Sequence, residues 1–556
     1  MSRGWPESRA IAMSQIDRHA SNGPASSTER ATEPLARRLL RQGGPVLVLV
    51  LALALAAWAI QHELAAVSLD DVGAAFGRIP TAKLVLAGCL VAASYVTLIG
   101  YDWSAFRYLG IPAPPGRLAL GSFCGYAIAN TAGFAVITGA SARHRIHAAG
   151  GLTLFDAGRV ALFSSTAFVI GITLLGGLGL LVAPSAVSDL VSLPAGLIQP
   201  IGLALVAGTI LIMLYCALGK PIRIGRFVLP MPGFGLATTQ LALSVIDVCL
   251  AGGALYVLIG AGAEVQIGYL AFLAVYCAAL TAGLLSHIPG GVGVFDAIIL
   301  AAYGWRVGPA QALAALLAFR ILYYILPFLI AAVVLAVIEI ARHRSASRIS
   351  SLARFEDIAD GMAPLIGAII AIGTGAGLLA LGVTPAGTPR GEIFGATIPY
   401  PLVETAHFLS SIVASALLFL GIGLIRRLDA AFGLTVIALL LSAAFVTIEG
   451  YGPLAIGAIL AMAVLLWPFR SAFRRETALF AEPLTAPWII GIALVLVSAA
   501  WLTDFAFSHQ VVGDETWYDV ALDEDAPRAW RALIGASVTA IGIGITFLLR
   551  RPGRFL

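Results

Sequence analysis

The sequence predicts an all-α polytopic membrane protein with about 14 transmembrane helices in two subdomains and at least one re-entrant helical hairpin. Hydrophobic residues make up 59% of the chain and charged residues only 12%, whereas soluble domains carry roughly 25% charged residues. The apolar runs are continuous and about 20 residues long, which excludes the alternating ten-residue segments of a transmembrane barrel. Arg and Lys gather in the loops between the runs, as expected where they fix the orientation of helices.

The chain begins with a Ser-, Arg- and Glu-rich stretch, 1–43, which we predict to be a disordered cytoplasmic tail. The first apolar run, 45–62, is long enough to span and has no convincing cleavage site after it, so it indicates a signal anchor. Further spans are predicted in a first membrane subdomain, 44–341, which holds 80–104, 116–140, 154–183, 199–218, 234–261, 266–286, 291–304 and 309–341.

A polar connection, "ARHRSASRISSLARFED" at 341–357, indicates an internal boundary. We therefore expect a cytoplasmic linker at 342–361 and a second membrane subdomain at 362–556. The spans predicted in the second subdomain are 362–384, 401–425, 429–449, 453–468, 485–503 and 528–549.

Basic loops predict the orientation of the helices. Loops such as 220–226, 341–348, 469–476 and 550–554 carry several Arg or Lys residues and should be cytoplasmic, while the acidic loop 513–528 should lie on the other side. Both termini are then cytoplasmic, and the expected location is the bacterial inner membrane.

The positions of the basic loops also require a re-entrant segment in the first subdomain, because the number of membrane crossings between two cytoplasmic loops must be even. The loop at Arg107 and Arg117 and the loop 220–226 should both be cytoplasmic, yet three apolar pieces separate them. The Gly-rich piece 116–140 is the best candidate for a hairpin that enters and leaves on one side. The run 291–304 is short enough to be a second re-entrant arm, in which case Pro327 would have to divide 309–341.

Ionisable side chains inside apolar runs are candidates for function, because a charge in the bilayer is costly. The alternative for each is a structural ion pair or a position nearer the interface. Asp247 lies deepest in a predicted span, and an Asp247–Arg320 ion pair is plausible; Asp156 and Arg159, one turn apart, are expected to pair. The candidate residues are Asp102, Arg143, Arg145, Asp247, His287, Asp296, Arg320, Tyr323, Tyr324, Glu404 and His407.

The stretch "SHIPGGVGVFD" at 286–296 predicts a broken helix near 286–304. Its helix-breaking residues are Pro289, Gly290, Gly291 and Gly293, and the backbone groups that they free must be satisfied by protein or water. We expect His287 to brace this break. Glu404 and His407 share a helix face, but one such pair has too few ligands for a metal. The sequence contains no P-loop, HExxH or GxSxG motif, so we expect no catalytic residue, metal or cofactor.

Four stretches together resemble the integral-membrane half of bacterial lysylphosphatidylglycerol synthases, the multiple peptide resistance factor (MprF) family. They are "SHIPGGVGVFD", "TGASARHRIHAAGG" at 138–151, "GYDWSAFRYLG" with Asp102, and "FRILYYILP" with Arg320, Tyr323 and Tyr324. They lie within about residues 80–330, and 362–556 is similar mainly in the number and arrangement of its helices. The "HAAGG" that follows the basic element departs from the family's usual aromatic and polar residues.

The resemblance implies a flippase that moves aminoacylated phosphatidylglycerol, lysyl- or alanyl-, from the inner to the outer leaflet. The cationic lipid lowers the negative surface potential and gives resistance to cationic antimicrobial peptides. Members of the family also synthesise this lipid from aminoacyl-tRNA through a C-terminal soluble domain. This sequence stops at "RRPGRFL", so we expect neither that transferase activity nor a nucleic-acid partner.

For such a lipid, Arg143, Arg145 and Arg320 suit the phosphate, and Asp102 and Asp247, with Asp296 or Glu404, suit the ammonium group. Besides the lipid and the bilayer, a homodimer is compatible with the sequence. Two other functions stay open: an ion-coupled transporter of small solutes built on discontinuous helices, and a membrane anchor or dimerisation platform for a synthase.

Overall fold

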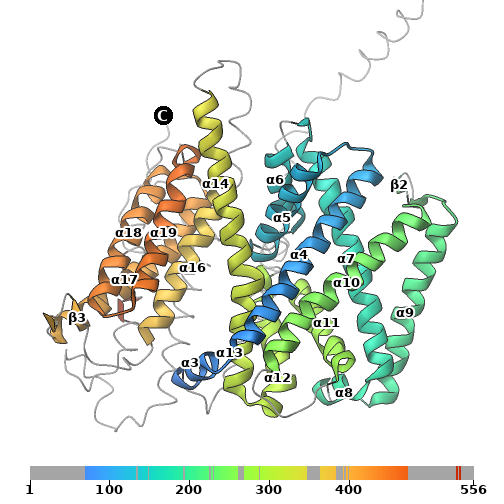
Figure 1. Ribbon diagram of the computed structural model, residues 1–556, viewed down its shortest axis with the longest axis horizontal. Coiled ribbons are helices and arrows are strands. Elements are labelled where there is room, and N and C mark those ends of the chain that lie inside the picture. Colours follow the sequence, from blue (N-terminus) through green and yellow to red (C-terminus); the bar gives the residue numbers. More distant parts are fainter. Residues whose placement is uncertain are drawn as a thin grey trace, which may run out of the picture. The chain divides into compact units, whose positions relative to one another are not determined.

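The computed structural model describes part of one of the two units into which the chain divides, 1–54 and 55–556. All described residues belong to the second unit (Figure 1). They are 69–132, 135–147, 150–191, 194–224, 227–229, 231–260, 268–286, 288–346, 363–383, 392–393, 396–397, 400–473 and a few positions between 534 and 542.

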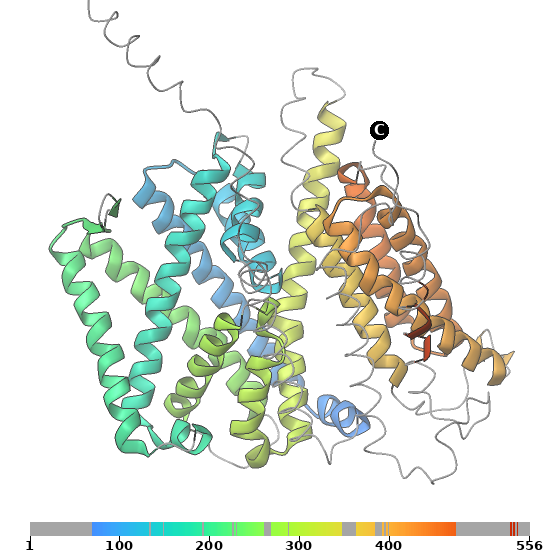
Figure 2. The same ribbon diagram turned by 180° about the vertical axis from the view of Figure 1, so that it is seen from behind.

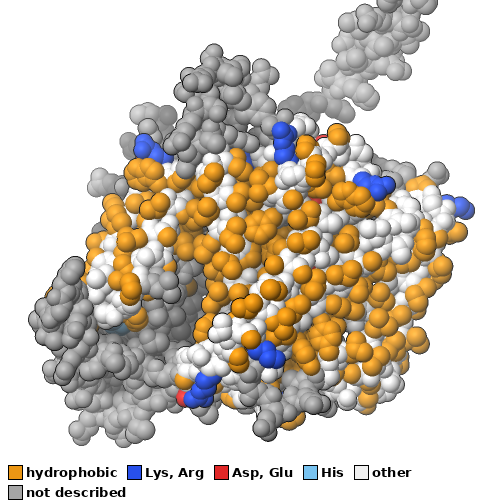
Figure 3. Space-filling model, viewed as in Figure 1, with side chains coloured by type: hydrophobic (Ala, Val, Ile, Leu, Met, Phe, Trp, Pro, Cys, Tyr) orange, Lys and Arg blue, Asp and Glu red, His pale blue; other side chains and the backbone are white. Residues whose placement is uncertain are grey.

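Seven helical segments in the described residues are long and apolar enough to cross a membrane. They are α4 (Thr81–Leu109), α7 (Leu154–Val182), α9 (Ala195–Ala217), α10 (Phe234–Ile259), the continuous segment Pro309–Ile338, and most of α17 (Tyr400–Ile425) and α18 (Asp429–Ile448). Their outward faces carry hydrophobic side chains, and the exposed Lys and Arg lie mainly toward the two ends of the bundle (Figure 3). The predicted class, an all-α polytopic membrane protein, is confirmed.

Shorter elements complete the described part. In the first half these are α3 (Leu69–Gly77), α8 (Ser185–Val191) and the strands β1 (Ile222–Ile224) and β2 (Phe227–Leu229), which form an antiparallel hairpin. In the second half, α16 (Ala363–Val383) packs on α17, and α19 (Pro453–Leu466) and a 3-10 turn at Trp467–Ala472 follow α18. A second pair of strands, β3 (Glu392–Ile393) and β4 (Ala396–Thr397), lies between α16 and α17. The predicted linker 342–361 lies largely outside the described residues.

A helical hairpin occupies the Gly-rich region where the sequence predicts one. Helices α5 (Pro115–Ala132) and α6 (Ala135–His147) pack against each other, with residues 133–134 outside the described part (Figures 1 and 2). With 13 residues, α6 is about 20 Å long at 1.5 Å per residue, too short for a 30 Å hydrocarbon layer. The hairpin extends to His147, beyond the predicted limit of 140, because the polar end of α6 is itself helical.

A second pair of short helices lies on either side of the predicted break. Helix α11 (Tyr269–Leu285) ends before a 3-10 turn at Pro289–Gly291, and α12 (Val294–Val307) starts just after it. Gly290, Gly291 and Gly293 all have positive φ, at 62°, 62° and 84°, a conformation open to glycine at little steric cost. The order of a long helix, a short helical hairpin and a second long helix thus occurs twice, in α4–α7 and in α10–α14.

Pro327 does not divide 309–341. Helix α13 (Pro309–Arg320) continues through a π-helical turn, η4 (Ile321–Ile325), into α14 (Leu326–Ala346). Proline cannot donate a hydrogen bond to the carbonyl four residues earlier, which is that of Tyr323. The Tyr95 hydroxyl of α4 donates to this carbonyl at 3.0 Å instead, so the helix passes the proline without an orphaned acceptor.

Candidate functional site

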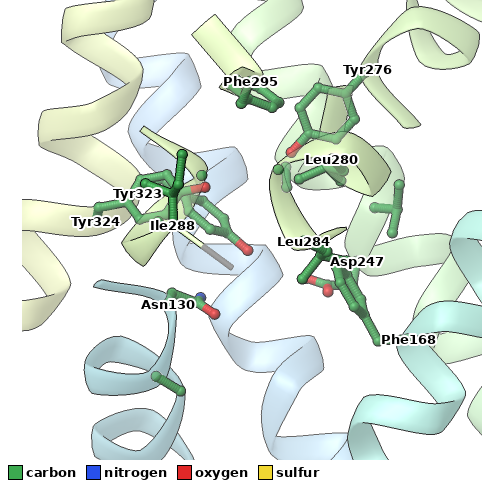
Figure 4. Close-up of a pocket in the computed structure, with 16 residues that line it drawn as sticks. Asn130, Phe168, Asp247, Tyr276, Leu280, Leu284, Ile288, Phe295, Tyr323 and Tyr324 are labelled. Carbon is green, nitrogen blue, oxygen red and sulfur yellow. The ribbon is translucent and has the colours of Figure 1, made fainter. Parts of the chain in front are cut away.

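A cavity of about 280 Å³ lies where the two short helical hairpins meet α7, α10 and the π-turn. Figure 4 shows Asp247, Asn130, Tyr276 and Tyr323 with their polar ends toward this space. Among the lining residues are Ala129 and Asn130 of α5, Phe168 of α7, Asp247, Val248 and Ala251 of α10, Tyr276, Leu280, Gly283 and Leu284 of α11, Ile288, Gly290, Gly291 and Phe295 of the break, and Tyr323 and Tyr324 of η4.

Asp247 is the acidic residue among those that line the cavity. It lies midway along α10 and is 1% exposed, and the Ser94 hydroxyl of α4 donates to its carboxylate at 2.5 Å. Within the described ranges no Arg, Lys or His forms an ion pair with it. A buried carboxylate without a cationic partner is costly, so it is suited to take a proton or a cationic ligand.

Arg320 ties the helix break to the wall of the cavity. Its guanidinium donates to both carboxylate oxygens of Asp296, at 3.1 and 2.8 Å, and also to the Gly290 carbonyl at 2.5 Å. Asp296 in turn accepts from the backbone N–H of Gly293 at 2.9 Å, which caps α12. The guanidinium lies 4.8 Å from the centre of the Tyr324 ring. These bonds satisfy carbonyls that the break has freed.

A second buried ion pair fixes the first hairpin to α4. Arg143 of α6 donates to both oxygens of Asp102, at 2.6 and 3.0 Å, and the two residues are 2% and 1% exposed. Ser122 and Tyr126 of α5 also donate to this carboxylate, at 2.9 and 3.2 Å. Both charged groups of the pair are therefore hydrogen-bonded, the condition under which a buried pair is tolerated.

Several predicted candidates thus belong to one region. Asp247, Tyr323 and Tyr324 line the cavity, and Arg320 with Asp296 forms part of its border. Asp102 and Arg143 form the neighbouring ion pair, and Arg145 is half-buried on the last turn of the same helix, α6.

The predicted Asp247–Arg320 pair is wrong. Asp247 faces α4, where Ser94 contacts it, whereas Arg320 ends α13 next to the break and finds Asp296 and the glycine carbonyls there. Exposed Asp156 and Arg159 do pair, at 3.5 Å.

Of the remaining candidates, His407 has a described side chain, and it is not among the residues that line this cavity. His287 and the side chains of Pro289 and Glu404 lie outside the described residues. His407 contacts Glu449, the residue that follows α18, with the His407 Nδ1 and a Glu449 carboxylate oxygen 3.6 Å apart. The described residues contain no group of three or more His, Cys, Asp or Glu that could hold a metal.

Sequence reasoning missed the neutral polar members of the site: Ser94, Asn130, Tyr276, Ser122 and Tyr126. Neutral polar side chains often form hydrogen bonds between membrane helices, so a single one does not indicate a functional site. A weak signal exists in α5, where Ser122 and Tyr126 are four residues apart and face one partner.

The sequence is similar to a known protein family and to several individual proteins. The family model described as the lysylphosphatidylglycerol synthase TM region matches residues 45–331. An uncharacterized protein (slr0712) of Synechocystis sp. is 31% identical over 291 residues, covering 52% of this chain and 90% of the relative. The inner membrane protein YbhN of Escherichia coli is 28% identical over 261 residues, covering 46% and 80%.

A phosphatidylglycerol lysyltransferase of Staphylococcus aureus is 26% identical over 278 residues, covering 49% of this chain. The matched region spans only 31% of that enzyme. The similarity therefore concerns the membrane region that holds the cavity and both ion pairs.

Proposed function

Because the chain belongs to the lysylphosphatidylglycerol synthase TM region family, we propose that it flips an aminoacylated phosphatidylglycerol, lysyl- or alanyl-, from the inner to the outer leaflet. Its setting would be the bacterial cytoplasmic membrane, with both termini cytoplasmic. Exposure of the cationic lipid would lower the negative surface potential and give resistance to cationic antimicrobial peptides.

The observation that carries the proposal is Asp247, a membrane-buried acid that lines a cavity and has no cationic partner among the described residues. An aminoacyl headgroup supplies the missing charge as an ammonium group. The cavity volume of about 280 Å³ is near the lower limit of ligand pockets, so it suits a headgroup while the acyl chains stay in the bilayer.

Arg143 and Arg320 have a different role from the phosphate binding that was expected from the sequence alone. Arg143 and Arg320 are each held by a carboxylate through two bonds, which neutralises most of their charge. We assign them to fixing the hairpins, and give the phosphate to hydrogen-bond donors that line the cavity, such as Asn130, Tyr276 and Tyr323.

The test is lipid translocation by the purified full chain in liposomes that contain lysyl-phosphatidylglycerol. A membrane-impermeant amine-reactive reagent reports the lipid in the outer leaflet over time. We expect Asp247→Asn to reduce the protein-dependent rate to that of protein-free vesicles, because an amide keeps the volume but loses the charge. Asp156→Asn, in an exposed pair, is the matched control and should flip like the wild type.

Flipping by Asp247→Asn at the wild-type rate would remove Asp247 from the site. If the wild-type protein moves no lipid but transports a soluble cation, its function is that of an ion-coupled transporter. If it moves neither and binds a synthase tightly, it acts as an anchor.

A further inference from the structure

A second pocket lies at the end of the bundle that carries β1 and β2. Its volume is about 430 Å³, and α4, α7, α9 and α10 line it together with the segment before α10. Most of the lining is apolar, and the polar exceptions are Tyr108 of α4, Arg159 and Thr166 of α7, and Gln240 of α10. The adjacent basic segment 220–226 is the one expected to be cytoplasmic.

Gln240 connects this pocket to the Asp247 cavity along one helix face. Gln240, Ser244 and Asp247 are spaced by four and three residues, so they share a face of α10; we call these three residues the α10 polar face. All three are at most 3% exposed. The face covers about 10 Å at 1.5 Å per residue, with one end at each pocket.

Helix α4 supplies polar groups opposite this face. The amide nitrogen of Gln240 donates to the Tyr101 carbonyl at 3.2 Å and to the Ser104 hydroxyl. Ser94 donates to Asp247 at the other end. Tyr101 lies between Ser94 and Ser104 along α4, and it interacts electrostatically with Asp247.

Two buried atoms along this route have no hydrogen-bond partner among the residues that the structure describes. They are the Tyr101 hydroxyl and the Gln240 side-chain oxygen, each in a residue that is at most 3% exposed. An unpaired buried polar group costs about 1–3 kcal/mol, and buried water molecules that bridge such groups are the usual solution. Water bound at these two atoms would join Gln240 to Tyr101 and lead along the α10 polar face toward Asp247.

The titratable groups facing Asp247 are phenols. They are Tyr95 and Tyr101 of α4, Tyr276 of α11 and Tyr323 of η4. In the described segments of α7, α9 and α13 no charged side chain pairs with Asp247. The acid is thus free to exchange a proton without breaking an ion pair.

We propose that the α10 polar face, with Tyr101, is a proton path between the pocket at the basic end and Asp247. A proton enters from hydronium at Gln240, moves through water and the Tyr101 hydroxyl, which gains one proton as it releases another, and converts the Asp247 carboxylate to the neutral acid. Release of this proton to water in the cavity that Asp247 lines restores the carboxylate and lets the transfer repeat. Nothing is oxidised or reduced, and no bond between heavy atoms changes. As the energy source for lipid flipping, the path rests on the proposed function; as a proton path, it is measurable without the lipid.

The experiment uses the full chain in liposomes with a trapped pH dye and a potassium diffusion potential. Wild-type vesicles should acidify faster than protein-free vesicles. Tyr101→Phe and Gln240→Leu should each lose this protein-dependent component. Thr238→Val is the control, since Thr238 is exposed on α10 and bonds to its own helix backbone.

Thermal unfolding separates this role from a merely structural one. Tyr101→Phe removes an unpaired buried hydroxyl, so it should unfold at the same temperature as the wild type or higher. A stable Tyr101→Phe protein with wild-type proton flux would overturn the proposal, and so would a wild type that acidifies no faster than empty vesicles.

Lipid flipping measured in the same vesicles keeps the two proposals apart. If the flipping rate does not depend on the proton gradient and is unchanged by Tyr101→Phe, the proton path is refuted and the flippase proposal stands. Proton flux that needs Tyr101, without any flipping, refutes the flippase and leaves the proton path.

Discussion

The Asp102–Arg143 pair gives the sharpest stability prediction for the first hairpin. Replacing Asp102 by Ala leaves the Arg143 guanidinium, 2% exposed, without its carboxylate and removes the acceptor for Ser122 and Tyr126. Gly125 and Gly139 pack against the guanidinium so closely that an added Cβ would lie 3.0 and 2.7 Å from it. The charge therefore has little room to move toward water.

The expected loss of unfolding free energy is about 3–5 kcal/mol, the usual result of removing one partner from a buried pair. Removing both charges at once should cost much less, because no buried charge is left unpaired. We therefore expect the double change Asp102→Leu with Arg143→Met to recover most of the stability that Asp102→Ala loses. The exposed pair supplies a control, and Arg159→Ala should change stability by less than about 1 kcal/mol.

Thiol labelling during thermal unfolding of the detergent-purified protein measures the loss of stability in the first hairpin itself. Cys124 of α5 is fully buried and lies between Ser122 and Tyr126 along the helix that contacts Asp102. The other four cysteines, Cys89, Cys216, Cys249 and Cys277, should first be replaced by Ala so that Cys124 alone reports. Labelling of Cys124 should begin at a clearly lower temperature in Asp102→Ala than in this single-cysteine background. Equal unfolding temperatures for these two proteins would refute the view that the pair holds the hairpin in place.

Two further changes test the packing and the break. Arg320→Lys should slow lipid flipping severalfold and lower the free energy of unfolding by only about 1 kcal/mol, because one ammonium group cannot donate in parallel to both Asp296 oxygens. The flipping rate and the unfolding temperature, measured on the same protein, check this. Gly171→Ala should destabilise the protein by about 1–3 kcal/mol, because the added Cβ overlaps Ser244 on the facing helix. Gly158→Ala is the control, because a Cβ there has no atom within 4 Å and should leave stability unchanged. An unchanged unfolding temperature of the Gly171 variant would contradict this packing.

Much of the fold was predictable because its signals are local. Continuous apolar runs predict helices, and the Gly-rich 116–140 and "SHIPGGVGVFD" predict where they break. The sequence left open whether the run 309–341 continues through Pro327, since this depends on the Tyr95 hydroxyl, 228 residues away from the Tyr323 carbonyl that it satisfies. A local rule for proline contains no information about such a distant donor.

The candidate site shows the same division. Sequence alone singled out Asp247, because an acid midway along an apolar run has no interfacial explanation. It also selected both members of each buried ion pair, but joined Arg320 to the wrong acid. Partners 24 and 41 residues apart, as in Arg320–Asp296 and Arg143–Asp102, meet only through helix packing.

What the sequence by itself determined is therefore the class of protein, the broken helices and the costly charges, since hydropathy and backbone chemistry act over a few residues. Only the tertiary structure decided which charges neutralise each other and left Asp247 with Ser94 beside a cavity. The physical reason is that the cost of a buried charge depends on its neighbours in space, and helix packing chooses those neighbours.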